Sequence, residues 1–235
     1  QIQEVIAGRL LWAPEHEGSE ALTLKDCEPL PAKDLMRKAE AFYEVPHYPS
    51  SAYGRCFGPI ALDKTLQFCA CLFKALCGAI VVDVDTGCAT CRCLALTTSA
   101  GDKETRTNVV TMLGVYLILR HGWSAQKVRE KLGRRDAGLK FACAWERGNK
   151  PEGERNTTVY NCWQGMELAL RLDWIGAGAV SEPSYRDQIC QRYRRWAYGY
   201  DGAWIVPGRI LVTADPCTTA ADPNPVTFKH ILFEK

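Results

Sequence analysis

The alternation of apolar and polar positions divides the chain into short strands and longer helices. An apolar run at 93–97 predicts a strand, and a polar turn at 98–105 follows it. A long apolar segment then predicts a helix beginning near Arg106. Another helix is predicted after Pro59, because apolar side chains recur there at steps of three and four residues, as on one helix face. This stripe consists of Leu62, Leu66, Cys69, Phe73 and Leu76, and Gly78 ends it.

The same pattern predicts the other elements, with prolines, glycines and polar clusters at their ends. Strands are expected at 9–13, 21–24 and 79–84, and a strand or hairpin at 203–212. Helices are expected at 33–43, 125–132, 156–173 and 184–196, and turns or loops at 85–91 and 133–156. Ser124 is expected to cap helix 125–132, and Asn156 or Thr157 the next one. Strands that alternate with helices predict an α/β protein with one central sheet flanked by helices.

Composition narrows the class of protein. The 235 residues are enough for one domain with a real core, and 47% hydrophobic and 24% charged residues are typical of globular proteins. The formal net charge of +2 argues against a dedicated nucleic-acid binder, although residues 120–155 are net basic and residues 1–45 net acidic. No apolar run approaches the about 18 residues needed to span a bilayer. We therefore expect neither nucleic acid nor membrane as a partner.

The 12 cysteines indicate free thiols rather than a disulfide framework. Several lie in apolar periodic runs, where a thiol behaves as a small hydrophobe. This favours a reducing compartment: cytoplasm, cytoskeleton or nucleus. Cys88-x2-Cys91-x-Cys93 resembles half of a zinc site, but no second cysteine pair of matching spacing follows. We expect no metal and no cofactor, and oxidation between neighbouring cysteines stays open.

The stretch 92–119 carries the candidate chemistry. A strand that leads through a polar loop to a helix N-terminus presents unpaired N–H groups and the positive end of the helix dipole to an anion. In Cys-x5-Arg phosphatases, a thiolate at the first loop position attacks phosphorus and the arginine grips the phosphoryl oxygens. Counting back from Arg106 gives Ala100, and no cysteine lies between Cys93 and Cys143. We therefore predict no catalytic residue, and a vestigial anion loop formed by Ser99, Ala100, Gly101, Lys103, Thr105, Arg106 and Thr107.

Arg106 has two interpretations. The helix dipole disfavours a cation in the first turn, so the arginine needs a local reason to be there. It either ties the structure together through a carboxylate such as Asp102 or Glu104, or it clamps an anion. The same two acids would repel a phosphate in this loop.

Five motifs in order along the chain resemble the N-terminal domain of the cell-division-cycle fourteen family of dual-specificity protein phosphatases, the mitotic-exit phosphatases. The most specific is Trp204-Ile205-Val206-Pro207-Gly208-Arg209, which is close to the family's W-I-V-P-G-K. The others are G-R-L-L-W-A at 8–13, Y-G-R-C-F-G-P-I at 53–60, the R-T-N helix start at 106–108 and Y-N-C-W-Q-G at 160–165.

The resemblance implies a dual-specificity or protein-tyrosine-phosphatase-like fold without catalytic residues, in which 1–212 form the domain and 213–235 a linker or tail. In the family, a second domain carries the catalytic loop and the first lines the substrate groove. Because the chain opens on Gln1, we expect it to be part of a longer protein. Our interpretation is an inert structural or interaction module whose partners are other proteins, such as a cytoskeletal or ciliary assembly. The alternative is the groove domain of an active phosphatase whose second domain lies downstream.

Overall fold

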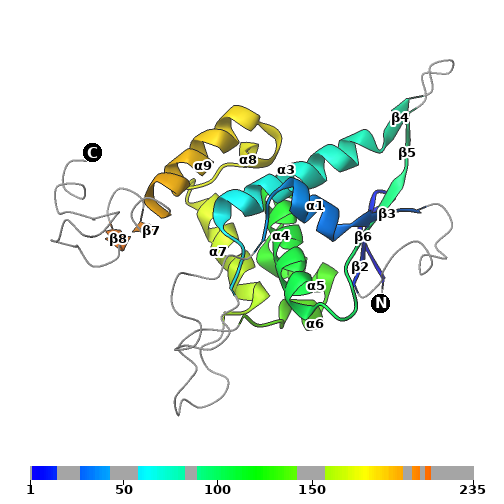
Figure 1. Ribbon diagram of the computed structural model, residues 1–235, viewed down its shortest axis with the longest axis horizontal. Coiled ribbons are helices and arrows are strands. Elements are labelled where there is room, and N and C mark those ends of the chain that lie inside the picture. Colours follow the sequence, from blue (N-terminus) through cyan, green and yellow to red (C-terminus); the bar gives the residue numbers. More distant parts are fainter. Residues whose placement is uncertain are drawn as a thin grey trace, which may run out of the picture. The chain divides into compact units, whose positions relative to one another are not determined.

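The fold is described from a computed structural model that covers residues 2–14, 27–42, 58–82, 89–141, 157–197, 203–206 and 210–212. The chain groups into two units, Gln1–Ser181 and Glu182–Lys235, which are described separately. The first unit contains the main sheet and most of the helices (Figure 1). In the described part of the chain, no helix is long and apolar enough to cross a membrane.

A four-stranded sheet with the order β1-β2-β6-β3 lies in the first unit. Strands β2, β6 and β3 are parallel, and β1 runs antiparallel to β2. Every residue of β2 is buried, as expected for a parallel strand that is covered on both faces. A separate hairpin of β4 and β5 extends from the end of α3. The bounds are β1 (Gln3–Ile6), β2 (Leu10–Ala13), β3 (Cys27–Pro31), β4 (Ile80–Val82), β5 (Ala89–Cys91) and β6 (Cys93–Thr97).

The helix that follows β6 is the centre of the helical core. Helix α4 (Lys103–His121) is buried at every residue from Arg106 to Leu119, and it packs against α3, α5, α7 and α8. Figure 1 shows α4 in green among these helices. The other helices of this unit are α1 (Ala32–Lys38), α3 (Leu62–Gly78), α5 (Ala125–Leu132), α6 (Arg134–Ala137), α7 (Val159–Arg171) and α8 (Gly178–Ser181).

The close contact between α4 and α7 requires a glycine. A Cβ at Gly114 would overlap the indole of Trp163. That indole is fully buried and donates a hydrogen bond from Nε1 to the carbonyl oxygen of Thr111, at 3.1 Å. Because glycine has no side chain, position 114 leaves space for the indole of Trp163, the largest residue of α7.

The second unit combines one helix with a hairpin. Helix α9 (Pro183–Ala197) packs against β7 (Ala203–Val206), which pairs antiparallel with β8 (Ile210–Val212). The predicted helix at 184–196 and the predicted hairpin at 203–212 are confirmed within the described residues. Residues 213–235, the predicted linker or tail, lie outside them.

The mixed α/β class is confirmed, and several predicted elements match the structure closely. The strand at 93–97 and the helix at 125–132 have the predicted bounds, and Ser124 caps the latter by accepting a hydrogen bond from the N–H of Lys127. Helix α3 follows the predicted stripe, although it begins at Leu62 and leaves Pro59 outside. The strand predicted at 21–24 lies outside the described residues.

Other predictions were wrong in their bounds or missed an element. Helix α4 begins at Lys103 rather than near Arg106, because Asp102 caps it. Residues 89–91, expected in a turn, pair with β4 as a strand, and α6 interrupts the loop predicted at 133–156. Helix α1 ends at Lys38, earlier than predicted, and Thr158 caps α7 in place of Asn156 or Thr157. Strands β1 and β3 and the short helix α8 were missed.

Candidate functional site

The loop between β6 and α4 lies where the sequence predicts an anion loop. Since β2, β6 and β3 are parallel, their carboxyl ends meet at one edge of the sheet, and residues 98–102 leave β6 there. In open α/β sheets this is the usual edge for binding ligands. The strand, the loop and the helix N-terminus are thus arranged as an anion site requires.

A carboxylate of the chain itself holds the N-terminus of α4. The Asp102 Oδ1 atom accepts a hydrogen bond from the N–H of Thr105 at 2.9 Å, and its Oδ2 accepts one from Thr105 Oγ1 at 2.6 Å. The acid therefore stabilises the positive end of the helix dipole, as an N-cap should. It also places a negative charge where a bound phosphate would meet the first turn.

Arg106 lies in a buried ion pair. Its Nε donates a hydrogen bond to Oδ1 of Asp136 at 3.2 Å, and its terminal amino group donates to the same oxygen at 2.5 Å. The other oxygen of Asp136, Oδ2, accepts a hydrogen bond from Trp12 Nε1 at 2.9 Å. All three side chains are buried. The network ties β2, α4 and α6 together.

This contact supports the interpretation of Arg106 as a structural tie. The partner shown here is Asp136, thirty positions further along the chain, whereas the sequence suggested Asp102 or Glu104. A buried guanidinium is costly without a paired acid, so Asp136 is what makes an arginine acceptable at this position. In this arrangement the planar guanidinium is directed to a carboxylate of the protein.

The remaining predicted loop residues are mostly exposed or use their polar groups within the first turns of α4. Ala100, Gly101 and Lys103 are exposed, and Ser99 is half-buried. The hydroxyl of Thr107 donates to the carbonyl oxygen of Lys103 at 2.7 Å. That this loop binds an anion therefore stays a prediction.

Two buried polar atoms near this loop lack a hydrogen-bond partner in the described structure. They are Thr98 Oγ1, directly after β6, and Asn108 Oδ1, in the second turn of α4. Buried polar groups are nearly always satisfied, by protein or by ordered water. Each of these two atoms is a place where we expect a bound water.

Three cysteine thiols have raised pKa values and are therefore not activated as nucleophiles. Burial raises the pKa of Cys162 to about 11 and that of Cys69 above its ordinary value. The pKa of Cys93 is raised to about 12, first by burial and then by the neighbouring Cys27. Catalytic cysteines need a lowered pKa, because the thiolate is the attacking form. These three thiols stay protonated at neutral pH.

His121, the last residue of α4, has a lowered pKa, although the residue is partly exposed to solvent. Its ring packs near Tyr116 and Trp123, with ring centroids 5.6 Å and 6.2 Å away. Burial lowers its pKa, and the positive charges of Arg120, Arg9 and Lys127 lower it further. In its neutral form the ring adds little to the charge at this helix end and interacts only weakly with the helix dipole.

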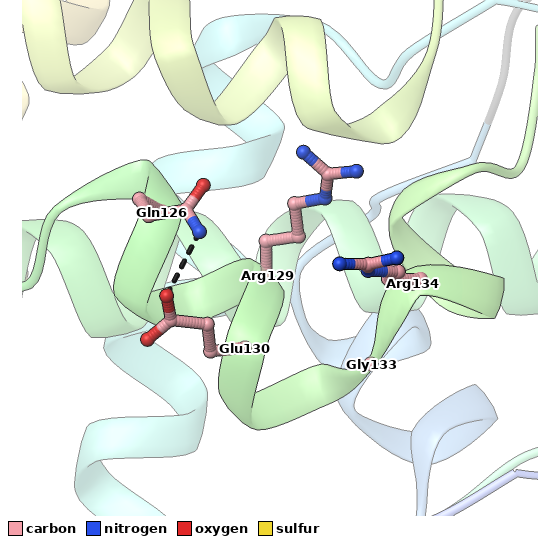
Figure 2. Close-up of a pocket in the computed structure, with 5 residues that line it drawn as sticks. All are labelled: Gln126, Arg129, Glu130, Gly133 and Arg134. Atoms are coloured by element: carbon pink, nitrogen blue, oxygen red, sulfur yellow. Dashed lines mark hydrogen bonds between the residues drawn. The ribbon is translucent and has the colours of Figure 1, made fainter.

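A shallow pocket lies on α5 and α6, within the region that the sequence identified as net basic. Its lining residues are Gln126, Arg129, Glu130, Gly133 and Arg134. Figure 2 shows Gln126 bonded to Glu130, and the Arg129 guanidinium reaching away from both. The Gln126–Glu130 distance is 2.8 Å, and Arg129 lies over the ring of Tyr160 at 4.9 Å. The pocket offers two guanidinium groups and one engaged carboxylate, which suits contact with an acidic group.

The described residues contain no group of three or more histidine, cysteine or acidic side chains that could hold a metal ion. Cys88, part of the zinc-like motif, lies outside these residues. In comparisons with known proteins, no family model matches the chain and no curated protein is similar to it.

Sequence reasoning singled out Arg106 but missed Asp136 and Trp12. Asp136 follows two arginines in a stretch that looked like a polar loop, and Trp12 looked like an ordinary buried residue of a strand. The available signal was Arg106 itself, because an arginine in an apolar helix implies a distant acid. That signal does not identify which acid.

Proposed function

We propose that this chain is a catalytically inert phosphatase-fold module with a structural or protein-interaction role. The observation that carries the proposal is the buried Arg106–Asp136 pair. The arginine that would grip a phosphoryl group in an active loop bonds an internal carboxylate. The loop before it supplies no thiol.

The proposed fold has support from the centre of the sheet. Strand β6 lies between two parallel neighbours, β2 and β3, and leads through a polar loop to the buried helix α4. A phosphate loop of the Cys-x5-Arg type needs this order of elements. The chain also has the five motifs that resemble the dual-specificity phosphatase family, among them Trp204–Arg209.

The interaction role is supported by the pocket on α5 and α6. Arg129 is held in place over Tyr160, and Arg134 projects from the next helix. Arginine presents a planar fork that matches carboxylates and phosphates, and it contributes to many protein interfaces. An acidic segment of a partner protein is the occupant that fits these charges best.

An activity assay tests the proposal. The purified chain is incubated with an aryl phosphate beside an active cysteine-dependent phosphatase as positive control, and we expect no phosphate release above the buffer blank. Arg106→Lys, checked for folding by circular dichroism, is the matched variant. Turnover by the wild-type chain that is lost in a folded Arg106→Lys variant would overturn the inert assignment.

The alternative assigns the chain to an active dual-specificity phosphatase as the wall of its substrate groove. The resemblance favours it, since family members have two domains in tandem. The coding sequence beyond Lys235 distinguishes the two roles. A stretch containing H-C-x5-R within about one domain length, on the order of 100–150 residues, would favour the enzyme. An unrelated sequence would favour the module.

A further inference from the structure

The main sheet brings together two cysteines that are far apart in the sequence. Cys27 is the first residue of β3 and Cys93 the first residue of β6, and the two are direct partners in the parallel register. Neighbouring strands lie about 4.8 Å apart. This separation falls within the range of Cα distances that disulfides span, roughly 4.4–6.8 Å.

The two thiols influence each other. The neighbouring Cys27 contributes to the raised pKa of Cys93, and both residues are half-buried, so part of each remains open to solvent. Next to them, Arg92 and Glu28 form an ion pair at 2.8 Å, which joins the same ends of the two strands. The pair is therefore held together by the strand register and by a second side-chain contact.

We propose that Cys27 and Cys93 are a reversible redox pair, whose two thiols form a disulfide that links β3 to β6. The oxidant is a small-molecule disulfide such as oxidised glutathione. The Cys27 thiolate attacks one glutathione sulfur, which forms a mixed disulfide and releases one glutathione thiolate. Cys93 then loses its proton to solvent and attacks the Cys27 sulfur, releasing the second glutathione. Two protein thiols are oxidised, and one glutathione disulfide is reduced to two thiols.

The order of the two attacks follows from the environment of Cys93. Burial and the neighbouring Cys27 raise the pKa of Cys93 to about 12, so little of it is present as the attacking thiolate at neutral pH. Once Cys27 is part of the mixed disulfide, the reaction of Cys93 is intramolecular. The proximity of the two strands then compensates for its low thiolate fraction.

The resulting bond would be easy to reduce. Side chains that face each other across parallel strands are separated by about the strand spacing, slightly more than the roughly 3.8 Å between Cβ atoms in a relaxed disulfide. Strained disulfides have more oxidising potentials, which is a property of labile and regulatory bonds. A disulfide here suits reversible control better than permanent stabilisation.

The link would join an edge strand of the sheet to its neighbour. Strand β3 lies at the edge next to β6, and it contains Pro29 and Pro31, which cannot donate hydrogen bonds to the ladder. A covalent link at the start of the strand connects two distant parts of the chain and so constrains the unfolded state. We therefore expect oxidation to stabilise the fold.

The test uses the full chain, oxidised with a graded series of glutathione redox ratios, alkylated and mapped by mass spectrometry. We expect a cross-linked peptide joining Cys27 to Cys93 and a melting temperature that rises by several degrees on oxidation. Dithiothreitol should reverse both effects. Cys27→Ser and Cys93→Ser should abolish both, while matching the wild-type melting temperature under reducing conditions.

Two other cysteines provide the controls. Cys91 is exposed and contributes slightly to the raised pKa of Cys93. Cys162 is a half-buried thiol on α7. Cys91→Ser and Cys162→Ser should keep the cross-link and the thermal shift. A cross-link between Cys91 and Cys93, a glutathione adduct that remains on Cys27, or a thermal shift that persists in Cys27→Ser would overturn the proposal.

Discussion

At the scale of single residues, the contact that matters most is between Arg106 and Asp136. A buried charge is tolerated only while its counter-charge is present, and here the carboxylate serves two donors on two different elements. The residue that looked like half of a phosphate site is thus part of a buried network. The stability of the fold should depend on it strongly.

Asp136→Asn should destabilise the protein by about 3–5 kcal/mol, since it keeps the shape of the side chain but leaves the Arg106 charge buried and uncompensated. Urea unfolding followed by circular dichroism measures this change. The matched control is Asp34→Asn, which removes the exposed ion pair with Arg37 and should change stability by no more than about 1 kcal/mol. Equal effects of the two substitutions would contradict the structural role of the buried pair.

His121 should make stability depend on pH. Its pKa is lowered in the folded state by burial and by nearby cations, so below its ordinary value of 6.5 the unfolded chain binds the proton more readily. Stability should therefore be constant above that pH and fall as the pH drops below it, until the folded-state pKa is passed.

The matched variant is His121→Gln, and urea unfolding at a series of pH values measures the difference. Between neutral pH and pH about 5, the wild-type chain should lose more stability than the variant. The reason is that His121 binds a proton more readily in the unfolded chain than in the folded chain. A titration of the His121 ring followed by NMR gives the pKa directly. A pKa above the ordinary value would contradict the assignment.

At the scale of elements, α4 is unusual in being buried over almost its whole length. An apolar pattern that surrounds a helix predicts burial but not which neighbours cover which side. Packing gives that answer: α7 approaches at Gly114, and α3, α5 and α8 cover other parts of the helix. The close approach of α7 is possible because Gly114 has no side chain.

Two glycine substitutions separate packing from helix propensity. Gly114→Ala should destabilise the protein by about 1–3 kcal/mol, because its Cβ would overlap the Trp163 indole. Gly165→Ala, on the exposed side of α7 with nothing within 4 Å of the new Cβ, should stabilise it by about 0.5–1 kcal/mol. Thermal and urea unfolding measure both. A stabilising Gly114→Ala would show that α4 and α7 are further apart than described.

At the scale of the whole molecule, the described structure divides after Ser181, whereas the motif order in the sequence suggested one domain through residue 212. The first unit contains the main sheet, α4 and the buried ion pair, and these elements form its core. The motif Trp204–Arg209 belongs to the second unit. Whether it contributes to the stability of the first is an experimental question.

Truncation answers that question. A chain ending at Ser181 should fold with a cooperative transition close to that of the full chain, because Gln1–Ser181 is a compact unit by itself. A chain ending at residue 212 is the control, and differential scanning calorimetry compares the two. If only the longer chain folds cooperatively, the domain extends to residue 212, as the sequence pattern predicts.

Several local elements could be predicted from apolar spacing and capping residues alone. The apolar spacing placed β6, α3, α5 and α9, and Ser124 marked the start of α5, because periodicity and capping act over a few residues. Strand β3 was missed because its two prolines are atypical of a strand. The lack of a thiol before Arg106 was also visible without a structure.

Contacts between residues far apart in the chain became visible only in the folded structure. It paired Arg106 with Asp136, Gly114 with Trp163 and Cys27 with Cys93. The physical reason is that helix packing and strand register depend on the whole arrangement, whereas a periodic pattern specifies only that a face is buried. The candidate loop was found in the sequence, and the partner that now engages its arginine was found in the fold.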